Sequence, residues 1–133
     1  MSAILKNADL KNADLSSADL RGAHLQYTHL ENAHLEGADL RGADLVSANL
    51  KNANLKNAFL EGTDDLRVAD LKNANLENTN LEGADLRGAN LVGAHLEGAN
   101  LMGVDLEGAI MPDGKKYDPA IHTKKQFTAP TPK

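Results

Sequence analysis

Histidine side chains are the first residues of this sequence with an evident capacity for chemistry, and they recur at a fixed spacing. His24, His29 and His34 lie five residues apart, each directly before a leucine, and His95 occupies an equivalent position much later. Neutral imidazole is a common metal ligand, so a cluster of these rings would suggest a zinc or other transition-metal site. Whether the rings converge depends on the backbone that carries them.

Aspartate residues recur with a longer period. Asp44, Asp65, Asp85 and Asp105 are 20 or 21 residues apart, and each directly precedes a leucine. Like charges held close together repel one another, so an aligned set suggests either compensation by neighbouring cations or a role facing a ligand. Whether these aspartates lie close together depends on whether the chain returns to the same face after about 20 residues.

The element that positions both sets is a five-residue repeat centred on leucine. Leucine recurs at every fifth position from Leu5 to Leu60, resumes one residue late at Leu66, and continues to Leu106, with Met111 next. Most units have Ala two residues before the leucine, Asp or Asn directly before it, and Gly or Asn two residues after it. The consensus Ala-(Asp/Asn)-Leu-X-(Gly/Asn) predicts a repeat architecture.

Neither an α-helix nor a flat strand accommodates a five-residue period. In a helix successive leucines would rotate by about 140°, and in a strand the next alanine would point away from the leucine face. A corner in each unit removes the conflict, because a type II turn over Leu-X-(Gly/Asn)-Ala needs the positive φ that Gly and Asn tolerate. Four corners close a square coil, and stacked coils lie roughly 4.8 Å apart.

On such a coil the histidines cannot meet. His24, His29 and His34 fall on three successive sides of the square, so their rings point away from one another. His95 shares the column of His34 but lies about three coils away. The sequence therefore predicts no metal site. It also supplies no nucleophile–base pair and no pocket, so we expect neither a cofactor nor an enzymatic activity.

The aspartates, in contrast, align. Residues 20 apart, or 21 apart across the extra residue, stack in one column, and the sequence predicts one candidate acidic face. Its members are Asp44, Asp65, Asp85 and Asp105. Arg67 and Arg87 lie beside this column. Nearby basic columns, Lys51 with Lys72 and Arg21 with Arg41, break up the negative field, which also fits a solvated surface without a ligand.

The extra residue marks the one departure from the pattern. We expect a β-bulge there, with Thr63 inward and one aspartate extruded, because an unpaired buried carboxylate costs several kcal/mol. Phe59 lies just before it, in an outward position that Asp or Asn normally holds. Phe59, Asp64 and Asp65 are therefore the candidate protein contact, since an aromatic anchor flanked by charge is typical of interface hot spots.

Composition excludes several classes of protein. The 133 residues contain no Cys, which rules out disulfides and thiolate chemistry, and aromatic residues make up only 3%. No N-terminal apolar run resembles a signal peptide or membrane span, so we expect a cytoplasmic protein without membrane contact. Residues 1–111 carry 9 Lys and Arg against 17 Asp and Glu, whereas residues 112–133 carry 5 Lys against 2 Asp. This acidic balance argues against direct binding of nucleic acid.

The unit resembles the pentapeptide repeat family, whose hallmark is Ala-(Asp/Asn)-Leu-X-X and which abounds in cyanobacteria. Residues 3–111 follow this hallmark with one interruption. The resemblance implies an all-β fold, a right-handed quadrilateral parallel β-helix, in agreement with the right-handed rule for parallel crossovers. It also implies a bacterial, cyanobacterial-type protein. Some members are proposed to mimic duplex DNA and bind DNA gyrase through an acidic face, and the resemblance permits that role here.

The ends of the repeat differ from its middle. We expect residues 1–111 to form the β-helix and residues 112–133 a C-terminal tail. At the N-terminal end, uncovered leucines and unpaired backbone edges can pair with a second copy, so a homo-oligomer through this end is one expectation.

The tail contains one helix signal. Asp118 followed by Pro119 resembles an N-cap and first helical residue. A short capping helix over about 119–127 would place Ile121 and Phe127, with the nearby Tyr117, on the last coil, and a disordered tail is the alternative.

Two functions follow from these observations. We favour a non-enzymatic protein–protein interaction or scaffold module that presents its outer faces to a protein partner, whose identity the sequence does not give. The alternative is a DNA-mimic regulator that binds DNA gyrase or another DNA-binding protein through the acidic face. The first predicts affinity centred on Phe59, and the second predicts affinity spread along the acidic face that falls steeply with salt.

Overall fold

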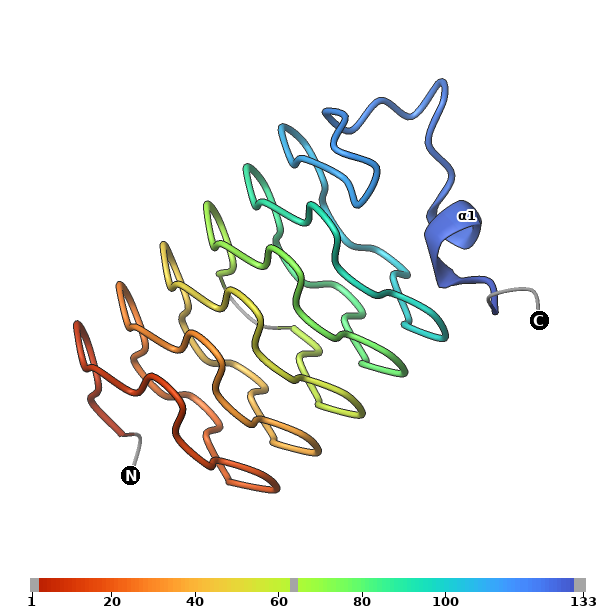
Figure 1. The fold of residues 1–133 in the computed structure, drawn as a ribbon. Coiled ribbons are helices and arrows are strands. Elements are labelled where there is room, and N and C mark those ends of the chain that lie inside the picture. The colour runs from red at the N-terminus through yellow and green to blue at the C-terminus, as the bar shows by residue number, and fades with distance from the viewer. Residues whose placement is uncertain (1–2, 63–64, 131–133) are drawn as a thin grey trace.

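The computed structural model describes residues 3–62 and 65–130 and shows a rod of stacked coils (Figure 1). Each unit turns one corner, and Leu5 O accepts a hydrogen bond from Ala8 N at 2.9 Å to close the first turn. From Leu5 to Leu106 the third residue of every described turn has positive φ, for example +64° at Asn7 and +66° at Gly22. The turn chemistry expected from the sequence is therefore present.

Successive coils are joined by parallel bridges between the outward residues that precede each leucine. Asp39 pairs with Phe59, a spacing of 20 residues, whereas Phe59 pairs with Asn80, a spacing of 21. One coil therefore absorbs the extra residue and the columns stay aligned. Thr63 and Asp64, for which we expected one inward and one extruded side chain, lie outside the described residues.

The bridges are single residues, not the longer parallel segments that a β-helix suggests. In the described ranges no run of residues forms a continuous strand, because each corner interrupts pairing after one residue. The backbone is nevertheless satisfied between coils. Leu25 N donates to Asp44 O at 2.8 Å, and Tyr27 N donates to Val46 O at 3.0 Å. Hydrogen bonds of this kind repeat along the rod and replace a conventional ladder.

Columns of leucine and alanine fill the interior. Leu55 is 1% exposed, and Ala38 is fully buried. Thr28 and Thr79 replace alanine at two inward positions, and each hydroxyl donates to a carbonyl oxygen at 2.7 Å. A hydroxyl is tolerated in this apolar core because it is hydrogen-bonded.

The C-terminal segment folds over the last coil and contains one helix, α1 (Lys124–Thr128). Thr123 is its N-cap, and a capping box joins Thr123 to Gln126. Asp118 instead accepts from Ala120 N at 2.9 Å and closes a separate turn, so the helix expected over 119–127 is shorter and begins later. Among the described residues, no helix has the length and apolar character needed to cross a membrane.

Three rings hold this cap on the rod. His122 is only 3% exposed and lies between Tyr117 and Phe127, with ring centroids 6.0 and 5.7 Å apart. Tyr117 and Phe127 pack against the core as expected. Ile121 does not, since it is 60% exposed. The turn closed by Asp118 directs His122 inward at that point, and His122 Nδ1 accepts from Asp118 N at 2.9 Å.

Candidate functional site

The outward side chains form a regular network. We call the residue before each leucine the bridge position and the residue after it the X position. A bridge residue contacts the X residue of its own unit and the X residue 18 positions earlier, on the preceding coil. Asp39 shows both, since Arg41 Nε donates to it at 2.8 Å and Arg21 Nε lies 3.9 Å away. The same offset brings Gln26 Nε2 to Asp44 Oδ2 at 2.8 Å.

The candidate acidic face is one column of bridge positions. Its members are Asp44, Asp65, Asp85 and Asp105, joined by bridges between the first two and between the last two. Arg67 Nε donates to Asp65 at 2.8 Å, and Arg87 Nε donates to Asp85 at 2.9 Å. These hydrogen bonds hold the pKa of both carboxyl groups below its usual value. The middle of the acidic face is therefore neutralised by two arginines.

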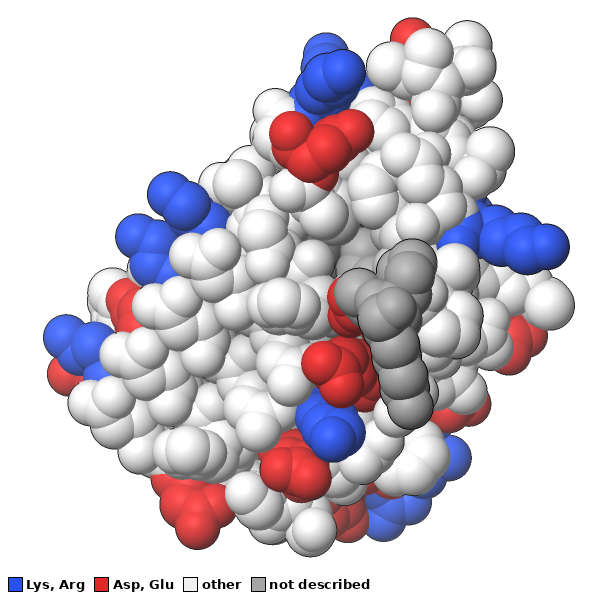
Figure 2. Space-filling view, turned by 45° about the vertical axis from the view of Figure 1, so that its right-hand side comes forward, with Lys and Arg blue, Asp and Glu red and all other residues white. Residues whose placement is uncertain are grey.

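Charge is mixed on other parts of the surface as well. On the face drawn in Figure 2, acidic and basic side chains lie in small interspersed clusters with uncharged surface between them. Lys11 Nζ lies 3.9 Å from Asp9, and Arg21 Nη2 lies 2.8 Å from Asp19. On this face the acidic side chains thus do not form one uninterrupted negative field.

Phe59 occupies the bridge position of a different column, between Asp39 and Asn80. Its side chain is on the surface, with 44% of the residue exposed. The guanidinium carbon of Arg41 lies 5.9 Å from the ring centroid, within the range of a cation–π contact. Because Arg41 also binds Asp39 through two nitrogens, both side chains are held in place. We refer to this pair as the Phe59–Arg41 platform.

The charged residues expected beside Phe59 are placed differently. Asp65 is 8% exposed, lies in the column of the acidic face and binds Arg67. Asp64 lies outside the described residues. The acidic neighbours of the platform are instead Asp39 and Glu61, and Arg21 is a basic neighbour. The pKa of Arg41 is raised, first by its hydrogen bond to Asp39 and to a lesser extent by Glu61.

A second group of exposed apolar residues lies on one corner of the rod. Tyr27 is 51% exposed and Val68 is 63% exposed, at turn positions that most other units give to Gly or Asn. Their φ angles are +59° and +60°. Positive φ is unfavourable for a β-branched residue, so Val68 carries local backbone strain.

The first three histidines diverge on three columns, as expected from the sequence. His95 lies close to two carboxylates that a comparison of the histidines alone does not reveal. The three divergent rings belong to His24, His29 and His34, whose bridge partners lie in three separate columns. Donor atoms of Glu77, His95 and Glu97 all lie within 4.8 Å of one another. A set of one imidazole and two carboxylates suits a divalent transition metal. The sequence signal was the 18-residue offset between Glu77 and His95.

Comparison with known families shows which repeat this is. A model described as pentapeptide repeats matches in eight copies, over residues 3–42, 28–64 and 69–110. No curated protein matches the chain. The family match covers most of the chain and coincides with the stacked coils.

Solved structures agree with the family match. HetL, a pentapeptide repeat protein involved in heterocyst differentiation regulation from Nostoc sp. strain PCC 7120, is 35% identical, with a TM-score of 0.68 over 88% of this chain and 63% of HetL. A pentapeptide repeat protein of the Arabidopsis thaliana thylakoid lumen is also 35% identical, with a TM-score of 0.71 over 73% of this chain and 67% of that one.

A third similar structure is a trypsin-treated form of QnrB1, a plasmid-mediated fluoroquinolone resistance protein. It is 29% identical, with a TM-score of 0.55 over 82% of this chain and 62% of QnrB1. The present chain thus spans less than two thirds of HetL and of QnrB1.

Several independent observations now coincide. The five-residue period, the corner in each unit, the 20-residue coil and the family match all describe the same repeat. Proteins of this kind are repeat scaffolds that are generally non-catalytic. The chain belongs to the pentapeptide repeat family.

Proposed function

We propose that this protein is a non-enzymatic interaction module that binds a protein partner through the Phe59–Arg41 platform. In this proposal the coil is right-handed and quadrilateral, as the family resemblance implies. The observation that carries it is the exposed ring of Phe59, the only Phe or Tyr at a bridge position, with Arg41 held against it. Aromatic and arginine side chains dominate interface hot spots.

The platform is organised before any partner arrives. Arg41 is fixed by its two hydrogen bonds to Asp39, and Phe59 stands on a backbone paired on both sides, with Asp39 and with Asn80. Side chains that are already ordered lose little conformational entropy on binding. A fitting partner would offer an apolar pocket for the ring, with a carboxylate or carbonyl at its rim for the guanidinium.

Affinity capture tests this proposal. The wild-type protein and the Phe59→Asn variant, which restores the consensus residue, would be used as baits in lysate of the source organism, with bound proteins identified by mass spectrometry. We expect the wild type to retain one protein and the Phe59→Asn variant to retain at least tenfold less of it. This is the change expected when a hot-spot residue that contributes about 1.4 kcal/mol or more to binding is removed. His29→Asn makes a matched change on another side of the rod and should retain it. Equal retention by all three baits would show that Phe59 does not contribute to the interface and would contradict the proposal.

The second candidate is a DNA-mimic regulator that acts through the acidic face. The likeness to QnrB1 over most of this chain favours it. Arg67 and Arg87 weigh against it, because they neutralise Asp65 and Asp85. A supercoiling assay with purified DNA gyrase separates the two candidates. Inhibition that is lost in Asp44→Asn and weakens steeply with salt would favour the acidic face, and no effect on gyrase would leave the platform as the better candidate.

A further inference from the structure

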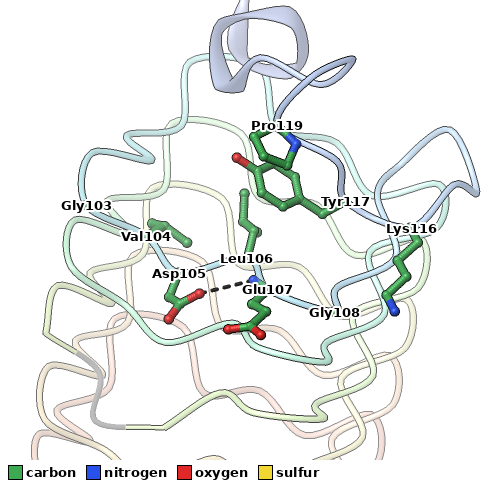
Figure 3. Close-up of a pocket in the computed structure, with 9 residues that line it drawn as sticks. All are labelled: Gly103, Val104, Asp105, Leu106, Glu107, Gly108, Lys116, Tyr117 and Pro119. Carbon is green, nitrogen blue, oxygen red and sulfur yellow. Dashed lines mark hydrogen bonds between the residues drawn. The ribbon is translucent and has the colours of Figure 1, made fainter.

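The cap leaves one side of the last coil open. A hollow of about 670 Å³ lies there, lined by residues 103–108 together with Lys116, Tyr117 and Pro119. In Figure 3 the segment 103–108 forms one wall, while Tyr117 and Pro119 stand across from it on the side of the cap. Val104 is 5% exposed, whereas Ala84 one coil earlier is 1% exposed. The end of the core is therefore less completely covered here than inside the rod.

The wall of this hollow carries backbone donors without acceptors. One coil earlier, Leu86 N donates to Asp105 O and Gly88 N donates to Glu107 O, both at 2.9 Å. The equivalent donors of the last coil are the N–H groups of Leu106 and Gly108. Within the part of the chain that the structure describes, neither of these N–H groups donates to any acceptor. Unpaired edges of this type are templates for an added strand.

The cap satisfies other groups of the same coil. Gly98 N donates to Thr128 O at 2.7 Å, and Met111 N donates to Lys115 O at 2.8 Å. Lys124 Nζ donates to Val104 O at 2.8 Å. The cap thus covers only part of the edge of this coil. It leaves the side of Leu106 and Gly108 uncovered, and among the described residues the N–H groups of Leu96, Leu101 and Gly103 likewise donate to no acceptor. A short segment can enter this opening, whereas a complete coil of a second copy would meet the cap.

We propose that this edge binds an extended peptide segment of another protein, which adds one unit to the solenoid. The carbonyl of a peptide residue i would accept from Leu106 N, and the carbonyl of residue i+2 would accept from Gly108 N. The N–H of residue i would donate to Val104 O, since a carbonyl has a second lone pair beside the one used by Lys124. This is strand addition to an open sheet edge, with the spacing set by the rod itself.

The side chains around the edge define the chemistry of the segment. Residues i−1 and i+1 would face inward over Val104 and Leu106, so they should be apolar. Residue i would face outward above Asp105 and, by the 18-residue offset, beside Glu107. Asp105 has Arg87 Nε at 3.8 Å from the coil below, but no Lys or Arg nitrogen of the described residues lies within 4 Å of the Glu107 carboxylate. A Lys or Arg at residue i therefore complements the edge.

This edge lies at the end of the rod and its occupancy does not depend on the Phe59–Arg41 platform. The two sites can be tested separately, because Phe59→Asn leaves residues 103–108 unchanged. A failure of one proposal therefore says nothing about the other.

Nuclear magnetic resonance with defined peptides tests the edge. The probe is acetyl-Gly-Ala-Arg-Leu-Lys-Gly-amide, and the matched control peptide has Asp in place of Arg. In the free protein we expect fast hydrogen exchange at the amides of Leu106 and Gly108 and slow exchange at those of Leu86 and Gly88. Addition of the Arg peptide should shift and protect the first two amides, with about tenfold weaker binding for the Asp peptide.

Two variants complete the test. Asp105→Lys should reverse the preference between the two peptides, whereas Asp9→Lys, the same change at a bridge position of the first coil, should not alter it. Absence of shifts at Leu106 and Gly108 with millimolar peptide would overturn the proposal. Slow exchange of both amides in the free protein would overturn it as well, because the edge would already be covered. Shifts that grow with protein concentration alone would assign the edge to a second copy instead.

Discussion

The rod and its C-terminal cap satisfy the same backbone in different ways. In the rod each coil pairs with a nearly identical neighbour, so one rule places the donors and acceptors of most described units, as at Leu25 and Asp44. In the cap the contacts are individual ones, such as the buried ring of His122 and the ammonium group of Lys124 on a carbonyl. Further coils could stack on the rod by the same contacts, whereas the individual contacts of the cap match only the last coil.

The difference shows what ending a solenoid requires. The last coil of a solenoid exposes unpaired backbone groups. Unless a different segment covers them, they can pair with the edge of another chain. The cap of this protein covers the last coil with three rings and a five-residue helix, α1. Because its contacts are not periodic, it cannot match every group of the coil, and Leu106 and Gly108 keep their N–H groups open.

The largest expected effect breaks the rod itself. Leu55→Asp places a carboxylate in a column of buried leucines, and we expect a loss of about 4 kcal/mol or more in the free energy of unfolding. Urea denaturation followed by circular dichroism would measure it. Glu36→Lys is the control, since Glu36 is exposed and should change stability by no more than about 0.5 kcal/mol. Matching urea midpoints for the two variants would show that the assignment of inward and outward positions is wrong.

A smaller effect should separate the cap from the rod. His122→Ala removes a buried ring and its hydrogen bond from Asp118 N, and we expect the cap to loosen at a cost of about 2 kcal/mol. Hydrogen exchange should then accelerate at the amide of Tyr117 while that of Leu40 keeps its protection. Ile121→Ala, at an exposed position next to it, serves as the control. Equal acceleration at Tyr117 and Leu40 would mean that cap and rod unfold as one unit.

Within the rod, relief of strain should increase stability. Val68→Gly removes a β-branched side chain from a residue with φ of +60°, and we expect a net gain of up to about 1 kcal/mol after the entropy cost of glycine. Gly88→Val introduces the opposite change on the same corner one coil later, at φ of +70°, and should lower stability by about 1–2 kcal/mol. Thermal denaturation of both variants measures the two changes in melting temperature. Shifts of the same sign would contradict the equivalence of these two corners.

The smallest effect concerns acid. The pKa values of Asp39 and Asp85 are lowered in the folded rod, chiefly by hydrogen bonds from Arg41 and Arg87. Their contribution is therefore present above the unfolded-state pKa of about 3.9 and is lost as the pH falls below it. Arg87→Gln should lower the urea midpoint at pH 7 and lower it less at pH 3, because the carboxylate of Asp85 becomes protonated as the pH falls. An equal loss at both pH values would assign the effect to packing instead of charge.

Much of the rod could be predicted because its rules are local and repeated. The Gly or Asn at the third turn position requires a corner, and Leu and Ala require an interior, so the columns follow by counting. The acidic column from Asp44 to Asp105 and the divergence of the first three histidines were obtained in this way. The cap was predicted less well, since Asp118 and Pro119 resemble a helix start that Thr123 provides instead.

The sequence by itself determined the corner in each unit, the coil of about 20 residues and the inward direction of most leucine and alanine side chains among the described residues, because the same steric and hydrophobic requirements recur in each unit. The tertiary structure decided which outward side chains meet. Arg41 lies over Phe59, and His95 comes close to Glu77, because residues 18 apart become neighbours only once the coils stack. It also decided which donors stay open at Leu106 and Gly108, since that depends on where an aperiodic segment comes to rest on the last coil.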